Sequence, residues 1–260
     1  MINLNNSKNK AVVVFGGSKS GNDSLFVEEA KKLGQELKSS GVEILIYGGS
    51  SDGVMGAFAS SFKKNGGTVV EISTEDFLIV DRAYGNESKG IADHQIITKG
   101  LPARKHLMMT GKEGLSDIRL SKETNRKAIR FLKKIEVIGA VALPGGTGTD
   151  DEIYEVIARN QEQSIKASAL KKEYNGPSLP LVVVNTKGIF DKVIDTINHK
   201  ISHGFTNEKD FRHFKILNTA VEAVEKLIEM ANIKEESIKK QPKKQNVVRK
   251  ILSKFKKVKA

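Results

Sequence analysis

The chain has 260 residues and no cysteine, which excludes disulfides, thiolate metal sites and thiol catalysis. Hydrophobic residues make up 38% of it and charged residues 28%, a balance that suits a globular protein with a water-exposed surface. No apolar run approaches the roughly 20 residues of a membrane helix, and the first ten residues lack the apolar stretch of a signal peptide. We therefore expect a cytoplasmic protein.

The net charge of +12 is concentrated at the carboxyl end of the chain. From Lys234 to Ala260 there are eleven Lys or Arg and two Glu, a net charge of +9, so the preceding residues carry only +3. The body of the protein is therefore not expected to be a basic nucleic-acid-binding surface. We expect residues 233–260 to form a basic, flexible tail, with contact to an anionic surface as the alternative. The alternative rests on apolar residues that share one side of a helical pattern: Val247, Val248, Ile251, Leu252 and Phe255.

Short apolar runs alternate with helical patterns along residues 10–232, which we expect to form one domain. The expected strands are residues 11–15, 42–47, 68–72, 94–98, 137–143, 181–185 and 214–217. Helical patterns follow caps at Asn22, Asp23 or Ser24 and at the capping box Thr219-x-x-Glu222, and others cover residues 57–64 and 190–197. Residues 73–93 are expected to be a polar loop. The alternation predicts an α/β fold, a single Rossmann-like, doubly wound parallel sheet with helices on both faces.

Three glycine-rich turns, at residues 16–21, 48–56 and 144–152, each follow an expected strand. Because the carboxyl ends of parallel strands meet at one edge of a sheet, we expect the three turns to lie together. The third turn leads directly into a helical pattern, and the first N–H groups of a helix can bind an anion. Glycine also lets the backbone come close to a ligand. The turns therefore predict a site for a small phosphorylated ligand.

With these turns and the Arg104-Lys105 pair, which Met108 follows, the sequence resembles the LOG ("lonely guy") family of phosphoribohydrolases, formerly called lysine decarboxylases. Residues 144–152 match that family's Pro-Gly-Gly-x-Gly-Thr-x-x-Glu motif. The resemblance covers nearly all of residues 10–232 and none of the tail. It implies hydrolysis of the N-glycosidic bond of a nucleoside 5′-monophosphate, of the AMP or N6-modified AMP (cytokinin) type, to free base and ribose 5-phosphate. It also implies a homodimer and no cofactor or metal.

The resemblance assigns the catalytic roles to Glu152 and Arg104. Cleavage of a ribosyl C–N bond develops oxocarbenium character, which a nearby carboxylate suits. An arginine can hold phosphate or nucleotide by paired hydrogen bonds. The residues expected to bind the phosphate and the rest of the substrate are Gly17, Ser18, Gly48, Gly49, Lys105, Gly145, Gly146, Thr147, Gly148 and Thr149.

Two alternatives concern the catalytic pair itself. Thr149-x-x-Glu152 also reads as a capping box, in which Glu152 would only close its own helix. An insertion relative to the family, at about residues 110–134, brings Arg126 and Arg130 nearer in sequence to the third turn than Arg104 is. We prefer Arg104, because the following methionine and the preceding strand also match the family.

Other departures from the family concern the base and the activity. Thr147 replaces an aromatic residue, and Arg159-Asn160 replaces the usual Trp-Ala pair, so base recognition is expected to differ. Met55 is expected to lie in the core, and the five histidines show no metal-ligand spacing. Because a fold does not determine an activity, a non-catalytic nucleotide-binding or sensor protein on the same fold is the alternative function.

Overall fold

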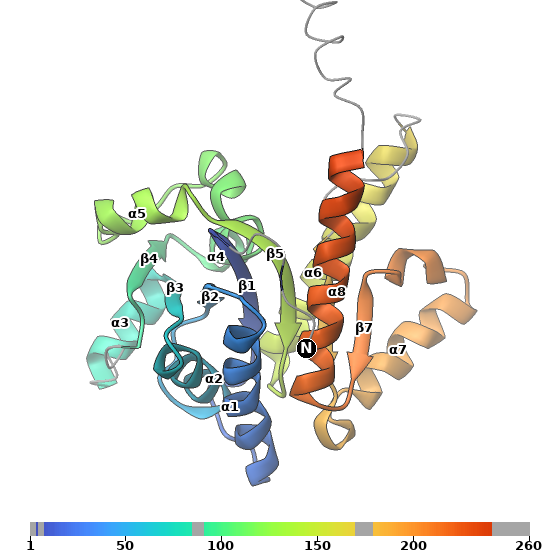
Figure 1. Ribbon diagram of the computed structural model, residues 1–260, viewed down its shortest axis with the longest axis horizontal. Coiled ribbons are helices and arrows are strands. Elements are labelled where there is room, and N and C mark those ends of the chain that lie inside the picture. The colour runs from blue at the N-terminus through green and yellow to red at the C-terminus, as the bar shows by residue number, and fades with distance from the viewer. Residues whose placement is uncertain (1–3, 5–7, 85–90, 170–178, 241–260) are drawn as a thin grey trace, which may run out of the picture.

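Seven parallel strands form one sheet in the order β4-β3-β2-β1-β5-β6-β7 (Figure 1). The computed structural model describes residue 4 and residues 8–84, 91–169 and 179–240. The strands are β1 (Lys10–Phe15), β2 (Ile44–Tyr47), β3 (Thr68–Thr74), β4 (His94–Thr98), β5 (Glu136–Ala142), β6 (Leu181–Val184) and β7 (Phe214–Leu217). Every expected strand is present, with ends that shift by one or two residues, and the predicted doubly wound parallel sheet is confirmed.

Helices cover both faces of the sheet. They are α1 (Ser24–Ser39), α2 (Gly53–Lys64), α3 (Glu75–Tyr84), α4 (Leu101–Thr110), α5 (Arg126–Leu132), α6 (Thr147–Ala169), α7 (Asp191–Ser202) and α8 (Ala220–Lys240). Three short 3₁₀ helices are η1 (Gly111–Ser116), η2 (Thr186–Gly188) and η3 (Glu208–Phe211). Side chains from α1, α2 and α8 form the core on one face, and side chains from α4 to α7 form the core on the other.

The central strand β1 explains why the apolar runs are continuous rather than alternating. Val12 and Val14 pack against the first group of helices, whereas Ala11 and Val13 pack against the second. All four residues are fully buried, because both faces of a parallel sheet are covered.

The chain reverses its direction of travel across the sheet at β1. It runs outward from β1 through β2 and β3 to β4, then returns to place β5 on the other side of β1. The helices that follow β1 and β5 lie on opposite faces, so a crevice opens between the carboxyl ends of these two strands. Two of the three glycine-rich turns begin at this point.

The segment after β3 differs from the expected loop, since α3 begins directly after this strand. Thr74 Oγ1 accepts a hydrogen bond from the N–H of Phe77 at 3.2 Å. Phe77, Ile79 and Val80 are 42%, 64% and 47% exposed, so residues 75–80, the part of this helix whose burial is described, show no regular buried apolar stripe. The loop prediction is wrong for residues 75–84; residues 85–90 lie outside the described residues.

The insertion relative to the family, at about residues 110–134, packs along β4. Ser121 and Thr124 form three hydrogen bonds with the backbone of Ile97, and Leu120 pairs with Thr98 as an antiparallel bridge. Ala128 and Leu132 of α5 are buried in the core on the same face as α4. The insertion thus covers one side of the sheet.

At the carboxyl end, α8 continues past Asn232, where we placed the end of the domain, to Lys240. Its first turn has the expected capping box, in which the N–H of Thr219 donates to Glu222 Oε2 at 3.2 Å and the N–H of Glu222 donates to Thr219 Oγ1 at 3.4 Å. Residues 241–260, with the apolar residues of the expected tail, lie outside the described residues. Among the helices that are described, none is both long and apolar enough to cross a bilayer.

Candidate active site

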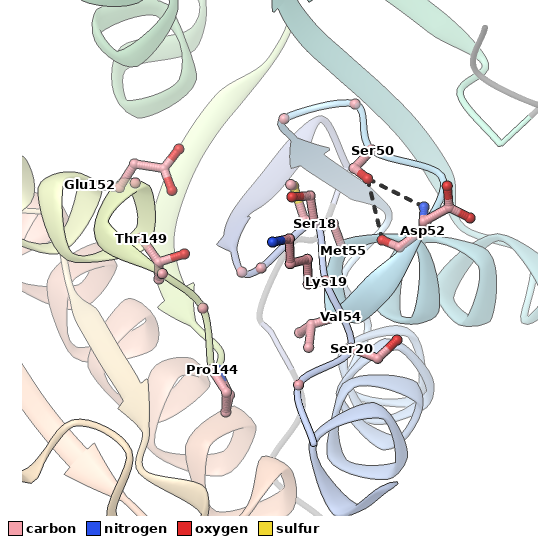
Figure 2. Close-up of a pocket in the computed structure, with 18 of the residues that line it drawn as sticks. Ser18, Lys19, Ser20, Ser50, Asp52, Val54, Met55, Pro144, Thr149 and Glu152 are labelled. Carbon is pink, nitrogen blue, oxygen red and sulfur yellow. Dashed lines mark hydrogen bonds between the residues drawn. The ribbon is translucent and has the colours of Figure 1, made fainter. Parts of the chain in front are cut away.

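A cavity of about 720 Å³ lies at the carboxyl edge of the sheet, at the crevice between β1 and β5. All three glycine-rich turns contribute to its wall, as expected from the parallel strands (Figure 2). The predicted site residues that line it are Gly17, Ser18, Gly48, Gly49, Arg104, Gly145, Gly146, Thr147, Gly148, Thr149 and Glu152. Its volume is in the range typical of sites for small organic ligands.

The third turn presents backbone N–H groups to the cavity at the N-terminus of α6. The N–H groups of Thr149 and Asp150 both donate to the carbonyl of Gly146, at 2.9 and 3.2 Å. Within the described part of the chain, none of the N–H groups of residues 145–148 donates to a protein acceptor. A Cβ at Gly145 would collide with Thr149 Oγ1, so a side chain there would disrupt the turn. Unbonded donors at a helix N-terminus form a site for an anion.

Glu152 lies in the second turn of α6 and extends toward the cavity (Figure 2). Because α6 begins at Thr147, Glu152 is too far along the helix to cap it, and the N–H of Thr149 donates to Gly146 instead. The capping-box alternative for this residue is therefore wrong. Burial raises the pKa of Glu152 to about 7, although the positive charges of Arg104 and Lys105 act in the opposite direction.

Arg104 reaches the cavity from α4 and is only 8% exposed. Its Nε donates to the carbonyl of Ile72 at 3.0 Å and its Nη2 donates to the carbonyl of Gly48 at 3.3 Å. The guanidinium also lies over the ring of Phe77, with its central carbon 5.3 Å from the ring centroid. A Cβ at Gly48 would collide with Nη2, so glycine at this position makes room for the arginine.

Two carboxylates act on the charge of Arg104. Burial lowers its pKa, and the charges of Glu152 and Glu71 oppose that change. Glu71 is 2% exposed on β3, beneath the second turn, and accepts a hydrogen bond from Gln95 Nε2 at 3.0 Å. Two carbonyl oxygens thus accept hydrogen bonds from the guanidinium, and the negative charges of two acids favour its protonated form.

The alternative arginines lie elsewhere. Arg126 and Arg130 are both exposed on α5, and neither lines the cavity. Of the three candidates, the structure brings only Arg104 into the same cavity wall as Glu152.

Lys105 lies outside the cavity wall, unlike the other predicted site residues. Its Nζ pairs with Asp151 at 2.9 Å and with Glu155 at 3.4 Å, so it joins α4 to the outer side of α6. The same two acids raise its pKa against the opposing effect of burial. Lys105 is therefore placed to hold the two helices that carry Arg104 and Glu152, and not to touch a ligand.

Several residues in the cavity wall were not predicted as site residues. They include Lys19, Ser20, Phe26, Ser50, Ser51, Asp52, Met55, Ser73, Phe77 and Ile189. The polar ones lie mostly in the glycine-rich turns, so their position in these turns could have identified them as site residues. Met55 is half-buried, packs against the core as expected and also lines the cavity. Phe77 belongs to the helix that sequence reasoning missed. The described residues contain no cluster of three or more potential metal ligands.

Comparison with known proteins gives two family models that together span most of the chain. The model described as "SLOG cluster4 family" matches residues 9–111, and the model described as "Possible lysine decarboxylase" matches residues 118–227.

Similar proteins include two plant enzymes and one fungal protein. Cytokinin riboside 5′-monophosphate phosphoribohydrolase LOG3 of Arabidopsis thaliana is 26% identical over 228 residues, which cover 88% of this chain and 86% of that protein. The rice enzyme LOG, from Oryza sativa subsp. japonica, is 26% identical over 223 residues, which cover 86% of this chain and 74% of that protein. The bifunctional cytokinin biosynthesis protein of Fusarium pseudograminearum is 30% identical over 84% of this chain, which spans only 39% of that protein.

Solved structures share the fold at lower identity. The molybdenum cofactor binding protein of Rippkaea orientalis is 17% identical, with a TM-score of 0.52, and the match covers 85% of this chain and 96% of that one. A structural-genomics target is 20% identical, with a TM-score of 0.52, and the match covers 85% of this chain and 98% of that one.

Proposed function

Because this chain is related to the LOG family over most of its length, we propose that it hydrolyses the N-glycosidic bond of nucleoside 5′-monophosphates to free base and ribose 5-phosphate. The observation that carries the proposal is the meeting of Arg104, Glu152 and the unbonded N–H groups of residues 145–148 around one cavity. Glu152 and the turn are contiguous in the sequence, whereas Arg104 comes from α4, far earlier in the chain. Together they provide the anion site, the fixed positive charge and the carboxylate that this reaction requires.

The phosphate group would bind at the N-terminus of α6. The N–H groups of residues 145–148 have no protein acceptor and would be available to an anion there, and the helix dipole would add to their effect. The ribose would then lie toward Glu152, one turn further along the same helix. This order places the scissile bond beside the carboxylate.

In the reaction, water attacks C1′ of the ribose as the bond from C1′ to the base nitrogen breaks. The base leaves with the bonding electron pair and takes up a proton, and the attacking water loses a proton as it becomes the 1-hydroxyl group. In its ionised form, Glu152 accepts that proton and stabilises the positive charge that develops on the sugar. A pKa of about 7 suits a group that must both accept and release a proton near neutral pH.

The preferred base belongs to the proposal as well. Apolar side chains of Phe26, Met55, Phe77 and Ile189 line the cavity and suit a planar purine. We propose AMP or N6-modified AMP, and hence cytokinin activation, because the similar plant enzymes carry that name.

The Arg159-Asn160 pair has structural contacts of its own. Arg159 contacts His106 Nδ1 at 3.1 Å, and Asn160 exchanges two hydrogen bonds with the backbone of Leu179, both at 2.9 Å. Neither residue lines the cavity, so we do not expect this pair to select the base.

A panel of AMP, GMP, CMP, UMP and N6-isopentenyl-AMP tests the proposal, with released base as the readout. We expect the wild type to release base and Glu152→Gln to be slower by about 10²- to 10⁴-fold. Asp150→Asn is the matched control, because this neighbouring acid on α6 does not line the cavity. If nucleotides bind and no base is released, the alternative of a non-catalytic nucleotide-binding or sensor protein is favoured instead.

The assembly and location are the remaining parts of the proposal. We expect a cytoplasmic homodimer, as the family resemblance implies, and a mass near twice 28.5 kDa by light scattering would support the dimer. The alternative to a flexible tail is that the basic residues 233–260 bind an anionic surface, such as anionic vesicles. Deleting them should weaken that binding and leave base release unchanged.

A further inference from the structure

One lysine of the first glycine-rich turn lies in the cavity wall. It is not among the site residues that the family resemblance implies. Lys19 lines the cavity, and its amino group extends toward the space between the first turn and the N-terminal part of α6 (Figure 2). We propose that Lys19 binds the dianionic phosphate of the ligand and makes the site prefer 5′-monophosphates over unphosphorylated nucleosides. The identity of the ligand in this inference rests on the proposed function.

The charges around the cavity explain why a further cation is needed. The charged residues of its wall are Lys19, Arg104, Asp52 and Glu152. Arg104 is already bonded to two backbone carbonyls, and its charge is opposed by Glu152 and by the buried Glu71. These two acids offset part of the positive charge of Arg104, so a second cation in the wall would strengthen binding of a phosphate dianion.

Lys19, in contrast, is not paired with other side chains in the described part of the chain. It is exposed, and within the described residues it forms no ion pair or side-chain hydrogen bond. The other lysine near the predicted site, Lys105, is paired with Asp151 and Glu155. Lys19 is thus the lysine in the cavity wall whose charge is available to a ligand.

The backbone that carries Lys19 is held in place on both sides. The carbonyl of Lys19 accepts from the N–H of Val54 at 3.4 Å, and the carbonyl of Gly17 accepts from the N–H of Met55 at 3.0 Å, which tie the turn to α2. The N–H of Gly17 donates to the carbonyl of Pro144 at 3.0 Å, which ties it to the third turn. The amino group therefore extends from a fixed base beside the proposed phosphate site.

A full positive charge adds a kind of selectivity that the backbone donors lack. The N–H groups of residues 145–148 are neutral and can bind oxygen atoms of many kinds. An ammonium group forms stronger, charge-assisted hydrogen bonds with a phosphate dianion than with a hydroxyl group. Removing it should therefore weaken binding of phosphorylated ligands and spare the others.

Calorimetric titration of Lys19→Gln, Lys19→Arg and wild type with ribose 5-phosphate, AMP and adenosine tests this inference. We expect Lys19→Gln to bind ribose 5-phosphate and AMP about 10- to 100-fold more weakly than wild type, because a charged hydrogen bond is lost. Its affinity for adenosine should be unchanged. Lys19→Arg should retain most of the affinity for phosphorylated ligands. Lys99→Gln is the matched control, since Lys99 is exposed after β4 and does not line the cavity.

Equal binding of ribose 5-phosphate by Lys19→Gln and wild type would overturn the inference, as would an equal loss of affinity for AMP and adenosine. A wild type that binds neither ribose 5-phosphate nor AMP would also overturn it. Because ribose 5-phosphate is the expected product and is not turned over, its binding is measured without catalysis, and the outcome is separate from that of the proposed function. If no nucleotide is cleaved and the expected binding pattern is found, the hydrolase proposal fails and the assignment of Lys19 stands.

Discussion

The side chain of Glu152 combines two opposing influences on its ionisation. Burial disfavours the carboxylate, whereas Arg104 and Lys105 favour it, and burial dominates. The resulting pKa of about 7 means that the proposed catalytic carboxylate is partly protonated at neutral pH.

The rate of base release should follow this ionisation. We expect kcat/KM for AMP to rise about tenfold per pH unit below pH 7 and to level off above it, because only the carboxylate can accept the proton from water. The substrate phosphate titrates near pH 6, so the pH dependence of ribose 5-phosphate binding serves as the control for that group. A profile that stays flat across neutral pH would contradict the role of Glu152 as the base.

The same ionisation affects stability with a defined sign. The folded protein holds the proton of Glu152 more tightly than the unfolded chain, whose ordinary pKa is 4.5, so wild type loses stability as the pH rises from 4.5 to about 7. Glu152→Gln carries no such charge. Above pH 7, its free energy of unfolding should exceed that of wild type by about 1–3 kcal/mol, and the difference should vanish near pH 4. Urea unfolding at the two pH values measures this, and a variant less stable than wild type at high pH would show that Glu152 is not destabilised by burial.

The three glycine-rich turns, which the sequence predicted to lie together, supply most of the cavity wall. Gly145, Gly146 and Glu152 lie in one contiguous motif, so their proximity follows from the chain itself. Lys105 was less predictable, because adjacent residues on a helix point in different directions and only the packing of α4 decides which one faces the cavity. Arg104 faces inward and Lys105 faces α6.

At the scale of elements, the second turn and α4 depend on each other. Gly48, which follows β2, leaves room for the guanidinium of Arg104, which lies 56 residues further along the chain. Gly48→Ala should displace that guanidinium and lower the free energy of unfolding by about 1–3 kcal/mol, because overpacking strains a filled site. Calorimetric binding of AMP should weaken in parallel.

The matched control for that substitution is Gly100→Ala. Gly100 precedes α4, and a Cβ there would meet its nearest neighbour, Pro102 Cδ, at 3.9 Å, an ordinary contact. If both variants lose the same stability and affinity, the contact between Gly48 and Arg104 has no special importance.

The four-residue pattern Thr-x-x-Glu occurs at two places in the chain and has a different structural role at each. Thr219-x-x-Glu222 forms the capping box that its sequence predicts, whereas Thr149-x-x-Glu152 lies inside α6. In the second case the helix begins at Thr147, two residues before the threonine that would cap it. The pattern is therefore ambiguous wherever another turn can start the helix earlier.

At the scale of the whole molecule, a ligand in the crevice should stabilise the fold. Such a ligand would contact turns after β1, β2 and β5 at once and would have no comparable site in the unfolded chain. At a concentration 100 times its dissociation constant, AMP or ribose 5-phosphate should add about 2.7 kcal/mol to the free energy of unfolding and raise Tm by about 5–10 °C. Scanning calorimetry with adenine as the comparison ligand measures the effect. No rise in Tm at that concentration would show that the folded protein does not bind these ligands preferentially.

The sequence by itself determined the strands, the sheet type and the three turns, because each depends on contiguous residues whose apolar runs and glycines act locally. It did not reveal α3, where Phe77, Ile79 and Val80 are exposed, and it favoured Arg104 as the partner of Glu152 while leaving other arginines open. Only the tertiary structure decided that β5 lies beside β1, that α4 brings Arg104 over Gly48, and that Lys19 shares a cavity with the N-terminus of α6. These arrangements depend on how helices pack across the sheet, and packing joins residues whose distance along the chain carries no signal of their contact.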